Sequence, residues 1–246
     1  MDKPTRRGRM RVATDQDIRR TARTLLVERG PEAVTLRAIA RELGITAPAL
    51  YRYYGSRDDL VQHLRVDVVN DLAARLAEET AGLDDGAAQL FAICRGFRRW
   101  ALTHTKEFTL VFASPTGDVG SAAGSVATLT RASEPFGRIF LMAAGHILAT
   151  HQLTIPPADA VPAEIRDDLA LFRNELFGVL RETGLEVPAD RLALGTTYVM
   201  IQFWARLYGH ITLEVFGNYP IPMSKPDAVF DALLADLANE IGLDGG

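Results

Sequence analysis

Apolar residues recur every three or four positions along most of the chain, which is the spacing that places them on one face of a helix. In the first 60 residues this pattern predicts three helices. The first would begin at Thr14, which with Asp17 forms a capping box, and would end at Gly30. The other two are short and lie between Thr35 and Tyr54.

The two short helices have a turn between them and a starting signal each. Thr35 can cap the first, and Gly44 suits the left-handed backbone that closes it. Thr46 then offers a cap for the next helix. A small residue at Ala40, a glycine at 44 and an apolar anchor at Leu50 indicate a helix-turn-helix.

In a helix-turn-helix the second helix enters the major groove of DNA with its N-terminus leading. The residues expected to face DNA are Thr46, Ala47, Pro48, Ala49, Tyr51 and Tyr53. Leu50 and Tyr54 would face the protein interior. Tyr54 can fill a core position if its hydroxyl finds a hydrogen-bond partner.

The same stretch resembles the DNA-binding domain of the tetracycline-repressor (TetR) family. The shared pattern is Thr35-x-Arg37-x-Ile39-Ala40-x3-Gly44-Ile45, followed by Leu50-Tyr51-x-Tyr53-Tyr54-x-Ser56-Arg57-x2-Leu60. Many members have His-Phe at Tyr53-Tyr54 and Lys at Arg57. The resemblance implies a homodimer that binds a palindromic double-stranded DNA operator, and a helical body that binds a small hydrophobic or aromatic effector. It also favours a repressor over an activator.

Four side chains are candidates to clamp phosphates or base edges: Thr35, Arg37, Tyr51 and Arg57. Arg37 is the best candidate to read a base, because a guanidinium can grip guanine with two hydrogen bonds. Arg57 would lie in the first turn of a long helix that Ser56 and Asp59 cap, where the positive end of the helix favours a phosphate.

Beyond residue 86 the pattern stays helical, with breakers at proline and glycine clusters. Helices are expected at about 86–104, 107–113, 121–153, 162–183, 189–216 and 225–242. The fold class is therefore all-α, with an N-terminal three-helix DNA-binding domain and a C-terminal helical domain for ligand binding and dimerisation. The expected divisions are a basic arm at 1–13, the helix-turn-helix domain at 14–60, a connecting helix at 61–80 and the helical body at 81–246.

Charge is unevenly distributed between these parts. Residues 1–60 carry 13 Lys+Arg and 8 Asp+Glu, whereas the rest carries 14 and 23. A basic segment on an acidic chain suits local binding to phosphates. The arginine-rich residues 1–13 precede any apolar periodicity and are expected to form an unfolded arm. This arm would either reach the adjacent minor groove or stay solvated without touching DNA.

The helix near 190–216 is apolar on more than one face, and no charged residue occurs between Arg191 and Arg206. Such a helix must be buried on all sides, which a two-fold dimer achieves. The preceding helix would join the interface through a stripe of apolar residues: Ile165, Leu169, Phe172, Leu176 and Val179. A single central helix in a monomer is the alternative. The run 203–214 also resembles a C-terminal signature of one TetR subgroup.

An effector pocket should be apolar with a few polar groups. The candidates are Phe97, Trp100, His104, Phe108, Phe112, His146 and Tyr198, each of which could instead be plain core. No cofactor or metal is expected, because the five histidines show no paired ligand spacing and Cys94 is the only cysteine. Cys94 is expected to be a buried, inert thiol.

The chain lacks the common catalytic motifs, including a glycine-flanked nucleophilic serine, HExxH and a P-loop, so we expect no enzyme. It shows no secretory signal and no membrane span, and a cytoplasmic location is expected. The competing hypothesis is a helical homodimer that binds a small molecule without acting through DNA.

Overall fold

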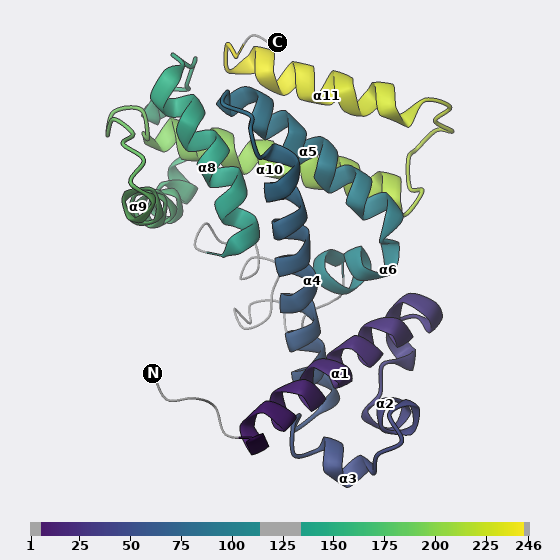
Figure 1. Cartoon of the computed structure of the whole chain (residues 1–246). Coiled ribbons are helices and arrows are strands. Elements are labelled where there is room, and N and C mark those ends of the chain that lie inside the picture. The colour runs from purple at the N-terminus through teal and green to yellow at the C-terminus, as the bar shows by residue number, and fades with distance from the viewer. Residues whose placement is uncertain (1–5, 114–133, 244–246) are drawn as a thin grey trace. The chain divides into compact units, whose positions relative to one another are not determined.

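The computed structural model describes residues 6–113 and 134–243, and for residues 6–13 it describes the backbone only. The described residues contain helices and no strand, which confirms the all-α prediction. The α-helices are α1 (Arg6–Arg29), α2 (Leu36–Glu42), α3 (Ala47–Leu50), α4 (Arg57–Thr80), α5 (Gly86–Thr103), α6 (Thr105–Phe108), α8 (Pro135–Thr150), α9 (Arg166–Thr183), α10 (Leu194–Val215) and α11 (Pro226–Glu240) (Figure 1). Short helical turns are η1 (Pro31–Ala33), the π-helical η2 (Thr109–Ala113), η3 (Ala158–Ala160) and η4 (Ala163–Ile165).

The contacts divide the described chain into two units. The head contains residues 6–71 and 104–113, and the body contains residues 72–103 and 134–243. The division falls within α4, so this helix belongs to both units. By their contacts, residues 104–113 group with the head, although they follow the predicted start of the helical body at residue 81 in the sequence.

The first helix differs from its prediction. It begins at Arg6 rather than Thr14, so the expectation of an unfolded arm is wrong for residues 6–13, and Thr14 cannot cap this helix. Arginine, methionine and alanine are good helix formers, and extending an existing helix costs far less than nucleating one. The rest of the predicted arm, residues 1–5, lies outside the described residues.

The predicted helices of the body agree with the structure to within a few residues, except at two places. The helix expected at 107–113 is a single α-turn followed by the π-helical turn η2. The helix expected at 121–153 is described only from Pro135, as α8, and residues 121–133 lie outside the described residues.

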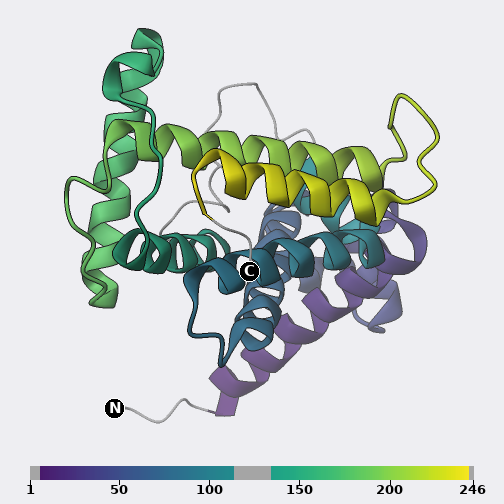
Figure 2. The same cartoon turned by 90° about the horizontal axis from the view of Figure 1, so that it is seen from above.

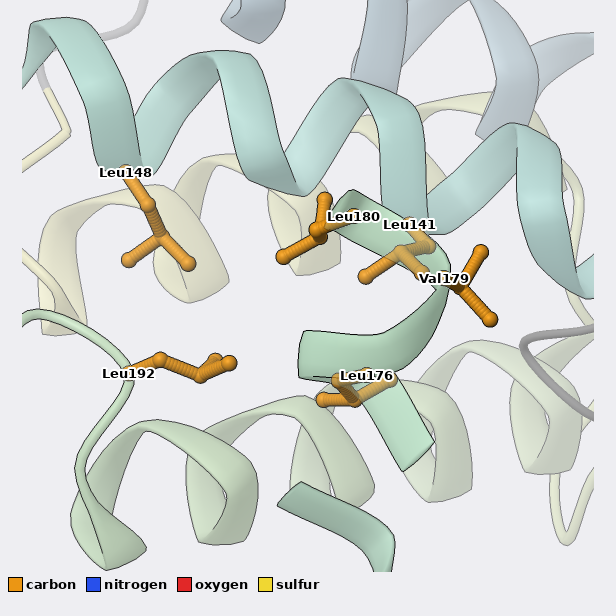
Figure 3. Packing of buried hydrophobic residues seen from close by; sticks show 6 residues of the cluster. All are labelled: Leu141, Leu148, Leu176, Val179, Leu180 and Leu192. Carbon is orange, nitrogen blue, oxygen red and sulfur yellow. The ribbon is translucent and has the colours of Figure 1, made fainter. Parts of the chain in front are cut away.

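The body is built on the packing of α8 against α5 and α9. Gly86 lets α5 approach α8 closely, because a Cβ there would lie only 2.8 Å from the His146 Cβ and from the Ile147 backbone nitrogen. A cluster of buried aliphatic side chains joins α8 to α9 and to the segment before α10; its members are Leu141, Leu148, Leu176, Val179, Leu180 and Leu192 (Figure 3). In the same unit α11 runs beside α10 (Figure 2).

Candidate nucleic-acid interface

The second helix of the chain starts and stops as predicted. The Thr35 hydroxyl accepts a hydrogen bond of 3.1 Å from the Ala38 backbone N–H, which caps α2. Gly44 ends the helix with φ of +64°, a backbone angle that glycine adopts without strain. The Ile45 N–H then donates to the Ala40 carbonyl over 3.0 Å, which closes the turn that leads into α3.

The third helix is a single turn whose two faces differ sharply. Leu50 is fully buried, whereas Tyr51, the next residue, is 55% exposed. Thr46 occupies the predicted N-cap position, but its side chain makes no capping hydrogen bond. Of the residues predicted to face DNA, Thr46, Pro48, Tyr51 and Arg37 are exposed, and Thr35, Ala47, Ala49, Tyr53 and Arg57 are half-buried.

A chain of polar contacts ties the end of the helix-turn-helix to α1. Tyr54 is 2% exposed, and its hydroxyl donates to Asp15 Oδ1 over 2.6 Å. Asp15 also pairs with Arg19 at 3.1 Å, and Arg19 reaches Asp67 of α4 at 2.7 Å. Burial, and then the Asp15 carboxylate, raise the pKa of Tyr54, so its hydroxyl stays a donor. Tyr54 thus fills the core position and has a partner.

Arg57 makes contacts that the sequence analysis did not anticipate. Its Nε donates to the Val34 carbonyl and its Nη2 to the Pro31 carbonyl, both over 2.8 Å. Its Nη1 lies 3.8 Å from Asp58 Oδ1. The guanidinium therefore joins the start of α4 to the corner between α1 and α2, and does not simply point outward.

The short helix α6 is attached to α1 by charged groups. Arg23 Nε lies 2.5 Å from Glu107 Oε1, and the same guanidinium pairs with Asp71 of α4. Glu107 is 2% exposed. Lys106 Nζ donates to the Val27 and Glu28 carbonyls at the C-terminal end of α1, at 2.6 and 3.1 Å.

Aromatic rings gather where α5, α8 and α10 of the body meet. Trp204 lies at the centre of this cluster: its ring stacks on those of Phe97 and Tyr208, and meets Phe136 and Phe140 edge-on. Trp100 stacks on Phe97. All these centroid distances lie between 5.8 and 6.4 Å. Because α10 is apolar on several faces, its sequence alone did not indicate which ring faces α5.

The pocket residues predicted from sequence are divided between the two units. Phe97, Trp100, His146 and Tyr198 belong to the body, whereas His104, Phe108 and Phe112 belong to the head. Phe97 and Trp100 join the aromatic cluster. Phe108 stacks on Phe112 at 5.3 Å, and His146 Nδ1 lies 3.1 Å from Gln89 Oε1. Cys94 is buried, as predicted, and burial raises the pKa of its thiol.

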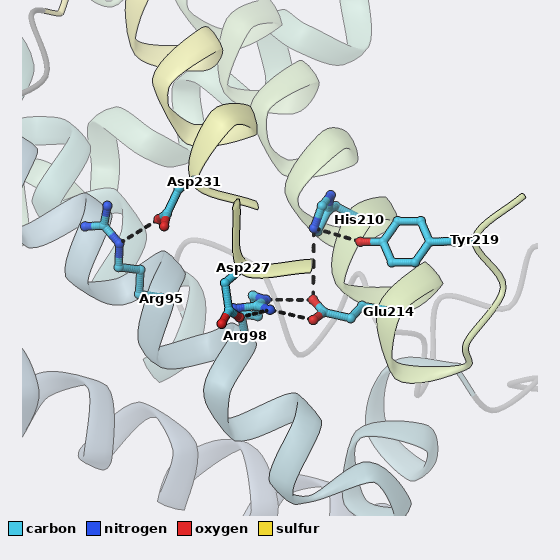
Figure 4. A network of polar contacts seen from close by, with 7 residues as sticks. All are labelled: Arg95, Arg98, His210, Glu214, Tyr219, Asp227 and Asp231. Carbon is cyan, nitrogen blue, oxygen red and sulfur yellow. Dashed lines mark hydrogen bonds and ion pairs between the residues drawn. The ribbon is translucent and has the colours of Figure 1, made fainter. Parts of the chain in front are cut away.

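A polar network in the body links α5, α10 and the start of α11 (Figure 4). Arg98 grips both carboxylate oxygens of Glu214, at 2.5 and 2.6 Å, and also reaches Asp227 at 2.6 Å. His210 Nε2 lies 3.0 Å from the Tyr219 hydroxyl and 4.0 Å from Glu214 Oε2. This network accounts for two polar residues of the 203–214 signature, His210 and Glu214.

The surface beside this network is hollowed by a shallow pocket of about 440 Å³. Its lining consists of Glu214, Gly217, Tyr219, Pro220, Ile221, Pro222, Met223 and Pro226. Among the described residues, no group of three or more histidine, cysteine, aspartate or glutamate side chains could hold a metal ion. No helix in residues 6–113 or 134–243 is long and apolar enough to cross a membrane.

Two family models match the chain. Residues 18–64 match the model described as "Bacterial regulatory proteins, tetR family", and residues 90–237 match "Tetracyclin repressor-like, C-terminal domain". The first match spans the helix-turn-helix, and the second spans residues 104–113 of the head together with most of the body.

Known proteins resemble the chain over nearly its whole length. The HTH-type transcriptional regulator Rv1816 of Mycobacterium tuberculosis (strain H37Rv) is 34% identical over 232 residues, which are 92% of either chain. The regulator Mb1846 of Mycobacterium bovis matches equally well. Among solved structures, SCO4313, described as a regulatory protein, is 25% identical with a TM-score of 0.62, over 96% of this chain and 100% of that one. The chain therefore belongs to the TetR family of DNA-binding transcriptional regulators.

Proposed function

We propose that the protein is a repressor that binds a palindromic operator as a homodimer and is released by a small hydrophobic effector. The main support for DNA binding is the difference in solvent exposure between Leu50 and Tyr51. Leu50 anchors α3 in the head, and the neighbouring Tyr51 is presented to solvent. A helix held on one face and open on the other can enter a major groove.

The homodimer rests on the exposed apolar residues of α10. Ile201 is 43% exposed, and Leu213 and Phe216 are each 41% exposed in the single chain. Of the predicted stripe at α9, Ile165 and Phe172 are half-buried in the single chain. Leu169, Leu176 and Val179 are buried within their own chain, so α10 is the main candidate for the interface and α9 contributes at most its outer face.

Two recognition helices in a two-fold dimer would read two half-sites one helical turn apart. Each subunit would place residues 46–53 in a major groove, and Arg37 is the proposed base-reading side chain, because it is exposed on α2. We propose that the arginine-rich N-terminal residues reach the adjacent minor groove, the alternative being that they do not touch DNA.

The effector site is proposed in the body, near the cluster around Trp204. Stacked and edge-on rings offer a surface for a flat apolar molecule. Phe97 and Trp100 are the proposed contacts there, and His146 and Tyr198 are further candidates in the body. The sequence-based proposal of an effector-binding role is kept for His104, Phe108 and Phe112. The effector must favour a dimer whose recognition helices no longer match the operator, with a coupling of about 1–3 kcal/mol.

The proposal is tested by fluorescence anisotropy with DNA from upstream of the protein's own gene, across a series of salt concentrations. We expect tight binding that falls steeply with salt, prefers the native duplex over a scrambled one and is lost in Tyr51→Ala. Leu102→Ala, at a 36% exposed position on α5 of the body, is the matched control and should bind normally.

The second candidate is a cytoplasmic helical dimer that binds a small molecule without acting through DNA. It is favoured only by the aromatic cluster and the apolar surface of α10, which do not require DNA. Failure of the wild-type protein to bind any duplex, even at low salt, would leave this candidate in place of the repressor.

A further inference from the structure

The arginines of the head fall into groups according to what their guanidinium contacts. Those on α1 from residue 19 onward are paired with carboxylates: Arg19 with Asp15 and Asp67, Arg20 with Asp17, Arg23 with Asp71 and Glu107, and Arg29 with Glu42. A phosphate that approached one of these groups would have to compete with a carboxylate that is already in place.

A second group binds backbone carbonyls. Arg65 is buried and donates to the Leu110 carbonyl at 2.9 Å. Arg57 donates to the Pro31 and Val34 carbonyls and has Asp58 beside its remaining nitrogen. To grip a phosphate with two hydrogen bonds, Arg57 would have to release at least one carbonyl of the α1–α2 corner.

The third group has no ion pair and no side-chain hydrogen bond in the described part of the chain. Its members are Arg37, Arg41 and Arg52, and all three are exposed. Arg37 and Arg41 are four residues apart and so share one face of α2. Arg52 follows Tyr51 in the turn after α3. Every unpaired arginine between residues 14 and 71 thus lies in the helix-turn-helix.

We infer that Arg41 and Arg52 supply phosphate contacts beside the base-reading Arg37, and that Arg57 is a positioning residue that fixes the N-terminal end of α2. A free guanidinium can bind phosphate at no cost in protein contacts, whereas Arg57 holds Val34, which directly precedes the cap residue Thr35. This inference rests on the proposed binding of the head to duplex DNA. It replaces the sequence-based role of Arg57 and adds two contacts that the motif did not indicate.

Salt dependence distinguishes these roles. Each phosphate contact that is lost lowers the slope of log K against log salt by about one, and by about two if both subunits of a dimer lose it. The experiment compares Arg41→Ala, Arg52→Ala and Arg57→Ala with the wild type. Arg20→Ala is the matched control, because its side chain is 75% exposed on α1, it removes the same charge, and Asp17 already pairs with it.

We expect lower slopes for Arg41→Ala and Arg52→Ala, with unchanged melting temperatures, and the wild-type slope for Arg20→Ala. Arg57→Ala should keep the slope and lose preference for the native duplex over a scrambled one. Arg57→Lys should behave like Arg57→Ala, because an ammonium keeps the charge but cannot match the two-point grip on both carbonyls.

Three results would overturn the inference. One is an unchanged slope in both Arg41→Ala and Arg52→Ala, and another is an equal decrease in Arg20→Ala, which would indicate a general effect of charge. The third is a lower slope in Arg57→Ala together with a wild-type slope in Arg57→Lys. A phosphate contact would give this result, because lysine keeps the positive charge. Failure of the proposed function is separate, because the wild-type protein itself would then show no salt-dependent binding.

Discussion

The Tyr54 hydroxyl and the Asp15 carboxylate, 39 positions apart in the sequence, form a hydrogen bond of 2.6 Å that joins the end of the helix-turn-helix to α1. Tyr54→Phe keeps the ring in the core but leaves Asp15 without this donor. We expect the free energy of unfolding in urea to fall by about 1 kcal/mol. Tyr51→Phe, at an exposed position, should change it by less than about 0.5 kcal/mol. An equal loss in both variants would contradict a specific role of the bond.

Removing Arg23 should destabilise the protein more than removing its exposed neighbour Arg20. Glu107 is buried, and without Arg23 its charge would lose its partner in the head. We expect Arg23→Ala to lower the free energy of unfolding by about 3 kcal/mol, and Arg20→Ala by well under 1 kcal/mol.

The double variant Arg23→Met/Glu107→Leu provides the control for this pair. It removes both charges and fills similar space, so it should recover part of the loss seen in Arg23→Ala. A double variant that is less stable than Arg23→Ala would show that packing at this position, rather than an uncompensated charge, determines the effect.

His210 should make the stability of the body fall at acidic pH. Burial lowers the pKa of His210, as does Arg98, although Glu214 raises it. The folded protein therefore resists protonation, whereas the unfolded chain takes up the proton near the ordinary value of about 6.5. Below about pH 6.5 the unfolded state binds more protons than the folded state, so the free energy of unfolding decreases as pH falls. The stabilising contribution of neutral His210 is therefore fully present above about pH 6.5 and is lost progressively below it.

The measurement is urea unfolding at pH 7.5 and pH 5.5. The difference in the free energy of unfolding between these two pH values should be smaller in His210→Gln than in the wild type. Glutamine retains a side chain that can form a hydrogen bond with Tyr219. A His210→Gln variant with the full pH dependence would assign the effect to other groups.

A charge on the exposed face of α10 should disrupt the proposed homodimer. Ile201→Asp would bury a carboxylate in an apolar interface, which is costly without a partner. Sedimentation velocity should then show a monomer and operator affinity should fall. Val27→Asp, at a similarly exposed position of α1, should leave the sedimentation coefficient unchanged. A wild-type protein that is already monomeric would reject the dimer.

Local signals made the helix-turn-helix predictable. Thr35 caps α2 and Gly44 ends it with a positive φ, as their sequence positions indicated. The same approach failed for residues 6–13, because it treated the arginine cluster as a break, although the helix propagates through it. It also did not separate the residues of the predicted α9 stripe that pack within their own chain, such as Leu176, from those that stay half-buried, such as Phe172, since a periodic apolar face does not reveal which surface covers it.

The sequence by itself determined the all-α class, the helix-turn-helix with Leu50 inside and Tyr51 outside, and the family, because each depends on residues within a few turns of one another. Only the tertiary structure decided what the charged side chains do. Arg23 meets Glu107 across 84 positions, and Arg57 meets the Pro31 carbonyl across 26. A guanidinium has no fixed partner until folding brings a carboxylate or a free carbonyl within reach, and helical periodicity carries no information about such distant neighbours.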